Sequence, residues 1–214
     1  MVRLILASSS PRRSQLLREA GITFDLARPD IDETPHPGEG PETYVLRLSQ
    51  EKAGAIPAEH HTLVLSADTT VADGQEILGK PAHLDEATAM LRQLEGRTHT
   101  VHTGVSLRDN SKGEAGHLSS KLTTSRVTMR PFSEAEIAAY VASGDPLGKA
   151  GSYAIQNSAF RPVSALEGCY TNVVGLPVCV VCEMLRDCGM DVPHAPPCSP
   201  SKLPCVMGRA DLIT

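Results

Sequence analysis

The sequence predicts a protein of the α/β class, and three observations support that prediction. Short apolar runs rich in Val, Leu and Ile alternate with helical patterns along the chain, as they do in α/β proteins. The length of 214 residues suits one sizeable domain. Aromatic residues make up only 3% of the chain and Trp is absent, so aliphatic side chains must build the core.

The first elements follow from local signals. Residues 3–7 are an apolar run that predicts a buried strand. Ser10 and Pro11 predict the N-cap and the first position of a helix, which Gly21 ends. The stretch 28–41 is rich in Pro, Gly and acidic residues, and we expect a loop there.

Pro41 predicts the start of a second helix. On one face of it lie, at helical spacing, Val45, Leu48, Lys52 and Ala55. Residues 62–67 predict another strand, which ends at Asp68. Asp85 can cap a third helix that ends before Gly96.

Two long strands and a capped helix follow. Partial alternation at 98–107 and 118–130 predicts two strands around a polar turn at 109–116. Ser133 and Glu136 have the spacing of a capping box, so a helix begins there and ends at Gly144.

The last part of the chain changes in composition. The segment 148–176 has strand-like pieces and no clear helix, and Pro177 predicts a final helix to about Cys188. Beyond it stand five Pro and little apolar pattern. We therefore expect one domain over 1–190 and a Pro- and Cys-rich tail over 191–214.

Composition excludes several classes of protein. The formal net charge is −5, whereas non-specific binding of nucleic acid needs a clustered basic face. We therefore expect no nucleic-acid partner. No apolar run approaches the roughly 20 residues of a membrane-spanning helix, and we expect no membrane association. All six Cys lie between 169 and 205, unlike a disulfide framework spread through a short chain, which predicts reduced thiols in a cytoplasmic protein.

Ser8 to Arg13 join the expected first strand to the first helix. Backbone N–H groups at a helix N-terminus attract anions, and hydroxyls with Arg12 and Arg13 would strengthen such a site for phosphate. The alternative is a capped helix with two solvated arginines.

Acidic residues supply candidates for a metal ligand or a base. Asp68 follows an apolar strand, and ligands of open α/β sheets gather outside the carboxyl ends of strands. It could hold a metal or activate water, or it could only form a turn. Asp30, Asp32 and Glu33 lie in the expected loop, where one could add a metal ligand, although acidic loop residues are commonly just solvated.

Two lysines could bind phosphate as point charges. Lys52 is the odd member of an apolar helical stripe, and Lys80 stands between Gly79 and Pro81 in a constrained turn. For Lys52 the commoner explanation is a side chain that snorkels from a helix edge.

Three other patterns give weaker support for a functional site. The segment 144–150 looks like a phosphate loop, but it is one residue short and lacks the Ser or Thr that binds magnesium. His99 and His102 on a strand would point to opposite faces, which argues against a zinc pair. Cys179 and Cys182 have no second pair at zinc-finger distance, and we expect buried thiols on one helix face.

Six motifs occur in one order along the chain: LASSSPRR at 6–13, SADT at 66–69, GKP at 79–81, THTVHTG at 98–104, GKAGSYAIQ at 148–156 and NVVGLP at 172–177. In this order they resemble the Maf proteins, nucleoside triphosphate pyrophosphatases once described as septum-formation inhibitors. The resemblance covers about residues 3–188. Residues 157–168 depart from it, because they lack the glycine-rich turn that often follows the Gln.

The resemblance implies a mixed α/β fold related to the inosine triphosphate pyrophosphatases, with an elongated sheet flanked by helices and a central cleft. It implies hydrolysis of a nucleoside triphosphate to the monophosphate and pyrophosphate with a divalent cation, Mg or Mn. The family's catalytic Asp, which accepts a proton from the attacking water, falls on Asp68, and its loop carboxylate falls on Glu33. These two would hold the metal. Ser8 joins the phosphate-binding stretch, and the phosphate-binding cations fall on Arg12, Arg13, Lys52 and Lys80.

The branch of the family that acts on dTTP and UTP looks like this sequence at Arg12, Thr69 and Gln156. The branch that acts on 7-methyl-GTP carries a Trp before its Arg instead. We therefore expect hydrolysis of dTTP and UTP, and homodimerisation is an expectation from the family alone. The alternative is a non-catalytic nucleotide-binding regulator of cell division, but such a binder has no need of a general base.

Overall fold

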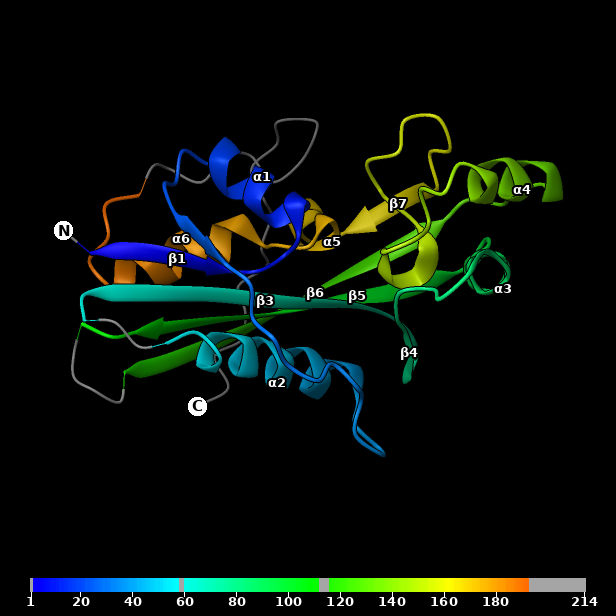
Figure 1. The fold of residues 1–214 in the computed structure, drawn as a ribbon. Helices are drawn as coiled ribbons and strands as arrows, with labels where there is room; N and C mark the ends of the chain where they lie inside the picture. Colours follow the sequence, from blue (N-terminus) through cyan, green and yellow to red (C-terminus); the bar gives the residue numbers. More distant parts are fainter. Residues whose placement is uncertain (1, 58–59, 112–115, 193–214) are drawn as a thin grey trace.

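The protein is described here by a computed structural model that covers residues 2–57, 60–111 and 116–192. Its centre is a seven-stranded mixed sheet with the order β2-β1-β3-β5-β6-β7, to which β4 adds by pairing with β3 (Figure 1). The strands are β1 (Arg3–Ala7), β2 (Asp25–Ala27), β3 (Thr62–Asp73), β4 (Glu76–Leu78), β5 (Thr98–Asp109), β6 (His117–Met129) and β7 (Val163–Glu167). The α/β class and the mixed, elongated sheet flanked by helices are confirmed.

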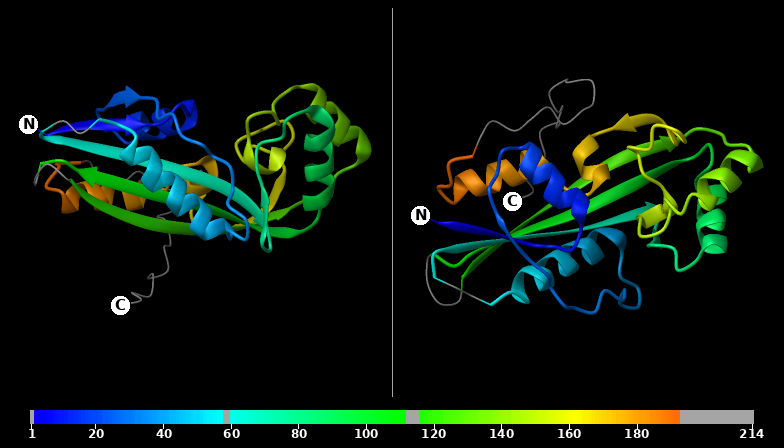
Figure 2. Two further views of the ribbon diagram at one scale, coloured as in Figure 1. Left: turned by 60° about the horizontal axis from the view of Figure 1, so that its bottom comes forward. Right: turned by 45° about the horizontal axis from the view of Figure 1, so that its top comes forward.

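Helices cover both faces of this sheet. They are α1 (Pro11–Glu19), α2 (Pro41–Gly54), α3 (Leu84–Leu94), α4 (Glu134–Ala142), α5 (Tyr170–Val174) and α6 (Val178–Asp187), with a 3-10 turn at Ala150–Ser152. Helices α1, α5 and α6 lie on one face, α2 lies on the other, and α3 and α4 gather at the far end of the long strands (Figures 1 and 2). No helix in the described part of the chain is long and apolar enough to span a membrane.

Alternation along β3 sends side chains to opposite faces of the sheet. Leu63 and Leu65 are fully buried in the core beneath α1 and α6. Val64, between them, packs instead with Ala53 of α2. The same alternation continues along the strand, and it therefore decides which layer each polar residue further along β3 meets.

Two large cores are strung along the long strands. The first surrounds β1 and the adjoining half of β3 and is closed by α1 and α6. The second gathers Val71, Val101, Val127 and Met129 with apolar side chains of α3 and α4. The middle of β3 passes from one core to the other.

The edge of β3 has a gap in its pairing. Strand β1 runs parallel to β3 and stops at the pair Ala7 with Ser66, and β4 begins at the pair Val71 with Leu78. Between them, residues 67–70 have no partner strand on that side among the described residues. The prediction that the strand ends at Asp68 is therefore wrong, because antiparallel pairing with β5 carries β3 on to Asp73.

Most of the expected elements are confirmed. The strand at 3–7, the helix from Pro41 and the capping box of Ser133 with Glu136 are all present. The last helix begins one residue after Pro177 and ends at Asp187.

Further expectations need correction. Strands β2 and β4 and the short helix α5 were not expected from the sequence. His83 rather than Asp85 is the N-cap of α3, since its side chain accepts a hydrogen bond from the Glu86 amide. Ser10 does occupy the N-cap position of α1, but its side chain makes no capping hydrogen bond.

The expected tail lies almost wholly outside the described residues. Val192, the last of them, is 7% exposed and packs in the first core. The division into a domain over 1–190 and a tail over 191–214 stays a prediction.

Candidate active site

A cleft of about 310 Å³ opens at the gap in β3. All nine residues singled out from the sequence line it: Ser8, Arg12, Arg13, Glu33, Lys52, Asp68, Thr69, Lys80 and Gln156. Among the described lining residues, five carry cationic side chains and two carry carboxylates. The cleft is therefore electropositive although the chain has a formal net charge of −5, which suits an anionic ligand.

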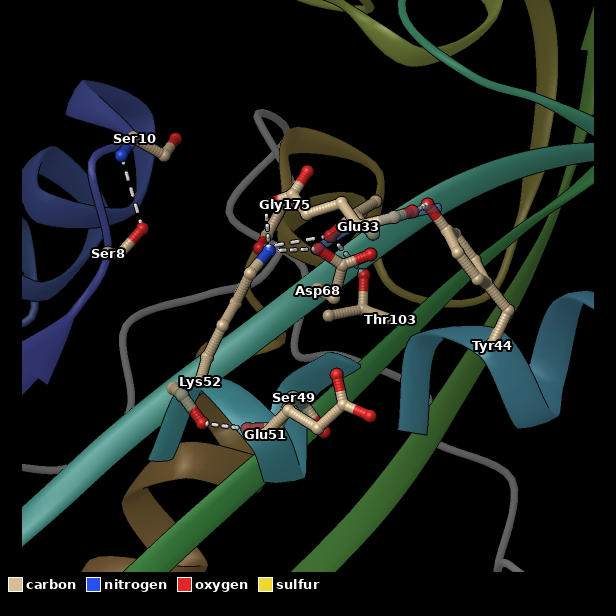
Figure 3. A network of polar contacts seen from close by, with 12 residues as sticks. Ser8, Ser10, Glu33, Tyr44, Ser49, Glu51, Lys52, Asp68, Thr103 and Gly175 are labelled. Carbon is tan, nitrogen blue, oxygen red and sulfur yellow. Dashed lines mark hydrogen bonds and ion pairs between the residues drawn. The ribbon is translucent and has the colours of Figure 1, made fainter. Parts of the chain in front are cut away.

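Lys52 joins the two carboxylates of the cleft. Its ammonium Nζ lies 2.6 Å from Asp68 Oδ1 and 2.6 Å from Glu33 Oε1. Figure 3 shows the side chain reaching from α2 toward Asp68 on β3 and Glu33 in the preceding loop. Its side chain is only 7% exposed, so Lys52 does not snorkel to solvent as the commoner explanation proposed.

Asp68 meets Lys52 because side chains alternate between the two faces of β3. Asp68 is on the same side of the strand as Val64 and Ser66, the side that faces α2, and the Ser66 hydroxyl donates to the Ser49 carbonyl oxygen of that helix. Lys52 follows Ser49 by three residues, which places both on one face of α2. Asp68 is itself 7% exposed.

The loop that carries Glu33 is anchored to α2. Tyr44 Oη donates to the Glu33 carbonyl oxygen at 2.9 Å. Arg47 Nη2 donates to the Thr34 carbonyl oxygen at 3.2 Å, and its guanidinium pairs twice with Glu39 at 2.7 Å. These contacts explain how a loop acid with a 43% exposed side chain is held over the cleft.

The neighbouring charges shift the pKa of several groups. Burial by itself would raise the pKa of Glu33, but Lys52 and Lys80 outweigh that effect and lower it. Burial, together with the charges of Asp68 and Glu33, raises the pKa of Tyr44 to about 12. Glu33 is therefore an anion, and Tyr44 a neutral hydrogen-bond donor, at neutral pH.

The strand-to-helix turn at 8–13 forms the wall beside Asp68. The Ser8 hydroxyl accepts a hydrogen bond from the Ser10 amide at 3.1 Å (Figure 3). Because the Ser10 side chain does not cap α1, the first amides of that helix remain available to a ligand's oxygen atoms.

Arg13 is held by protein acceptors on this wall. Its guanidinium donates to the Gly175 carbonyl oxygen at 2.8 Å, to Thr69 Oγ1 at 3.2 Å and to Ser8 Oγ at 3.4 Å. Burial lowers its pKa, and the charge of Asp68 opposes that shift. Neither of the two arginines is thus a solvated surface residue, since Arg12 also lines the cleft and is half-buried.

The opposite wall is the segment 148–156, which contributes Tyr153 and Gln156. The Gly151 amide donates to the Gly79 carbonyl oxygen at 3.2 Å, so this wall is tied to the turn that carries Lys80. Lys80 Nζ lies 3.5 Å from Glu33 Oε2 and its side chain is 63% exposed.

The carboxylates fit a hard divalent cation. No cluster of three or more metal-ligating His, Cys, Asp or Glu is found in the described part of the chain. Mg²⁺, however, keeps several waters and needs only one or two carboxylates when a ligand's phosphates supply the rest. No described residue donates to Asp68 Oδ2, which leaves that oxygen able to coordinate.

The two histidine rings have separate partners. His99 Nε2 is 2.8 Å from the Tyr153 hydroxyl, whereas His102 contacts Thr124 and Thr100. Of the CxxC pair, Cys182 is buried and Cys179 is half-buried on α6.

A family profile described as Maf-like protein matches residues 3–188. The chain belongs to the Maf family. It is 47% identical over 191 residues to a protein named dTTP/UTP pyrophosphatase from Myxococcus xanthus (strain DK1622), covering 89% of this chain and 94% of that protein. A second relative of the same name, from Pelotomaculum thermopropionicum, is 45% identical, and the match covers 90% of this chain and 100% of that protein.

A solved structure is also similar to this Maf chain. It is the nucleoside-triphosphatase, dITP/XTP pyrophosphatase, of Mycobacterium abscessus, with 15% identity and a TM-score of 0.37 over 60% of this chain and 73% of that chain. The match is too distant to bear on the site.

Several residues in or around the cleft were missed from the sequence. Tyr44 and Arg47 anchor the loop of Glu33, and Lys149 lines the cleft while its ammonium bonds Asp145. Thr103 bonds the hydroxyl of Thr69. Thr103 and Lys149 stood inside quoted motifs, which was the one available signal.

Proposed function

We propose that this protein hydrolyses nucleoside triphosphates to the monophosphate and pyrophosphate, with UTP and dTTP as its main substrates. The observation that carries the proposal is the ammonium of Lys52 between Asp68 and Glu33 in an electropositive cleft. The names of relatives at 45% and 47% identity support both the reaction and the substrates.

The reaction needs a base, cations and little else. The water oxygen bonds to the α-phosphorus, the bond from that phosphorus to the oxygen bridging the α- and β-phosphates breaks, and a water proton must be accepted. Negative charge grows on the phosphate oxygens and on the departing pyrophosphate, so preorganised cations supply most of the stabilisation. Lys52, Lys80, Arg12 and the amides that begin α1 are the groups we assign to that role.

Asp68 is the group we assign as proton acceptor. It is a buried carboxylate with one oxygen on Lys52 and the other without a described protein partner. Lys52 holds the carboxylate in one orientation, and a base held within reach of its proton is effective.

Glu33 and Asp68 are the residues we assign to a divalent cation, Mg or Mn. A bound cation would neutralise phosphate charge and lower the pKa of a coordinated water. Lys52 would keep the two carboxylates together, and Lys80 would remain beside Glu33 on the exposed side.

The base of the nucleotide is assigned to the wall at 153–156 together with Arg12 and Thr69. The Gln156 amide offers one donor and one acceptor, which can pair with O4 and N3–H of a uracil or thymine ring. Unpaired polar groups penalise a base with the wrong pattern.

Three further expectations belong to this proposal. The cysteine usage supports a cytoplasmic compartment, and the negative net charge supports a protein without a nucleic-acid partner. A homodimer rests on the family alone.

A substrate panel tests the proposal. Pyrophosphate release would be measured for UTP, dTTP, CTP, ATP, GTP and 7-methyl-GTP with Mg²⁺, with Mn²⁺ and with EDTA. We expect UTP and dTTP to exceed ATP and GTP at least about tenfold in kcat/KM, a difference worth about 1.4 kcal/mol, and EDTA to abolish turnover. Nucleotide binding without pyrophosphate release would favour a regulator instead, and a lead for 7-methyl-GTP would overturn the base assignment.

A further inference from the structure

Gln156, which we assign to the base of the nucleotide, is positioned by the backbone of a short turn. Its side chain is exposed and makes no hydrogen bond to another residue in the described part of the chain. It is the third residue of a four-residue turn, in which the Asn157 amide donates to the Ala154 carbonyl oxygen at 3.0 Å. Whatever fixes the two ends of this turn therefore fixes where the Gln156 amide can reach.

Asp145 is bonded to both ends of that turn. It follows α4 and is not among the residues that line the cleft. Its Oδ2 accepts from Asn157 Nδ2 at 3.1 Å and from Tyr140 Oη at 2.7 Å. The Tyr140 hydroxyl in turn accepts from the Ala154 amide at 3.1 Å. One carboxylate oxygen thus holds the last residue of the turn directly and the first through a single hydroxyl.

Backbone amides fix the direction of these hydrogen bonds. The Ala154 amide can only donate, so the Tyr140 hydroxyl accepts from it and gives its single proton to Asp145. Asn157 Oδ1 accepts from the Phe160 amide at 2.7 Å, which turns the side-chain nitrogen of Asn157 toward Asp145. Both ends of the turn therefore need an acceptor at position 145.

Asp145 is an anion in this setting, and a third donor ties it to the start of the same wall. Lys149 Nζ lies 3.0 Å from Asp145 Oδ1 and also donates to the Asp145 carbonyl oxygen. Burial by itself would raise the pKa of Asp145, but its three hydrogen-bond donors outweigh burial and lower that pKa. The acceptor is therefore fully ionised at neutral pH.

We propose that Asp145 is a positioning residue, whose carboxylate holds this turn so that the Gln156 amide meets the base of the nucleotide. The inference rests on the proposed function and deepens it. Hydrogen bonds weaken steeply once their geometry departs from the preferred range, so a turn that can shift loses its bonds to uracil or thymine. The groups assigned to the triphosphate do not belong to this turn.

Asp145→Ala removes the acceptor for both ends of the turn. UTP should lose the pairing with Gln156, whereas ATP does not present the O4 and N3–H pattern and has less to lose. We expect the UTP to ATP ratio of kcat/KM to fall at least about threefold, since a small displacement of a positioned group is costly. The dissociation constant of inorganic tripolyphosphate, which has no base, should stay unchanged. An equal loss of UTP and ATP turnover would overturn the proposal.

Two conservative variants carry the test if Asp145→Ala does not fold. Tyr140→Phe removes only the hydroxyl that bonds the Ala154 amide, while its ring keeps its stacking 4.1 Å from the ring of Phe160. We expect it to lower the same ratio, and an unchanged ratio would contradict the proposal. Asp145→Asn keeps an oxygen that can accept from both ends of the turn and gives up only Lys149 Nζ, so it should retain the wild-type ratio. A loss as large as in Asp145→Ala would assign the effect to Lys149 instead.

Glu134 supplies the matched control at the other end of α4. Its side chain is 70% exposed, pairs with Arg92 and does not line the cleft. Glu134→Ala also removes a paired carboxylate, and we expect it to leave the UTP to ATP ratio unchanged.

A double-mutant cycle separates the positioning of Gln156 from general support of the wall. With Gln156→Ala already in place, Asp145→Ala should not change the ratio further, because the amide that Asp145 positions is gone. The same effect with and without Gln156 would overturn the proposal. Dissociation constants of the α,β-methylene analogues of UTP and ATP give the same ratio without turnover. If the wild-type chain releases no pyrophosphate, the proposed function fails, while these constants still decide the role of Asp145.

Discussion

The carbonyl oxygen of Val45 lies only 2.4 Å from the place where a Cβ atom on Gly104 would stand. Gly104 is paired with Asp68 across β5 and β3. Val45 precedes Lys52 by two helical turns and shares its face of α2. The absence of a side chain at Gly104 therefore lets the helix come close enough for Lys52 to meet Asp68.

Gly104→Ala tests this close approach. The added methyl group meets backbone atoms, which cannot turn aside, so α2 must shift. We expect a loss of about 1–3 kcal/mol in the free energy of unfolding, measured by urea denaturation, and a clear loss of kcat. Gly54→Ala is the control on the same helix, since nothing lies within 4 Å of that position. An unchanged kcat in Gly104→Ala would show that the spacing of α2 does not matter to the site.

Asp68→Asn removes the assigned proton acceptor and keeps its shape. We expect kcat to fall by about 10²–10⁴ while binding of a non-hydrolysable triphosphate is largely retained. Asp73→Asn is the same change further along β3, where the carboxylate pairs with Arg97 outside the cleft. It should leave kcat within twofold. More than a tenth of wild-type kcat in Asp68→Asn would contradict the assignment.

Variants of the two lysines should differ in their free energy of unfolding. Lys52→Met leaves two carboxylates facing one another without their shared cation, and we expect it to lower both kcat/KM and the free energy of unfolding, the latter by about 1–3 kcal/mol. Lys80→Met removes an exposed ammonium, so its unfolding midpoint should stay unchanged. Its kcat/KM should fall by an amount that corresponds to about 1–3 kcal/mol of lost transition-state stabilisation. Lys121→Met, on β6 and paired with Glu183, is the control. Equal stability of the first two variants would argue against Lys52 as a bridge.

His99 should make the fold sensitive to mild acid. Burial lowers the pKa of His99 from its ordinary 6.5 to about 4, and its Nδ1 has no hydrogen-bond partner. The unfolded chain therefore takes up a proton between these values that the folded chain does not. The contribution of neutral His99 to the free energy of unfolding should be fully present above pH 6.5. It should be lost progressively toward pH 4, by at most about 3 kcal/mol.

The measurement is the unfolding free energy at several pH values for wild type and His99→Gln. The difference between the two curves should be flat above pH 6.5 and slope below it. His117→Gln makes the same change at an exposed position on β6 and supplies the control for the substitution itself. Parallel curves for His99→Gln as well would refute the assignment of this pKa.

Local signals predicted most elements, and the failures have two physical causes. The strand at 3–7 and the helix from Pro41 have local boundaries, an apolar run and a proline. The continuation of β3 past Asp68 does not, because Thr69 and Thr70 suit a turn as well as a strand and only pairing with β5 decides between them. Helix α5 is five residues long, which is too short for a periodic pattern.

The cleft residues were found by motif, whereas their contacts were not. The bond between Thr69 and Thr103 joins residues 34 apart, and the bond from Arg13 to Gly175 joins residues 162 apart. No local pattern encodes such pairs. The expected reason for the place of Asp68 was also wrong, since it lies within a strand rather than after one, although the turn after β1 does stand at a carboxyl end.

The two cores on either side of the cleft hold different parts of the proposed ligand. Helix α1 and the turn that we assign to the phosphates pack on the first core, and the wall with Tyr153, which we assign to the base, packs on the second. A change that reshapes the second core can therefore move the assigned base wall while the assigned phosphate turn keeps its support. We therefore expect that successive substitutions in the second core can change, in small steps, which base the protein accepts. At each step the protein would still bind the triphosphate, which is common to every substrate.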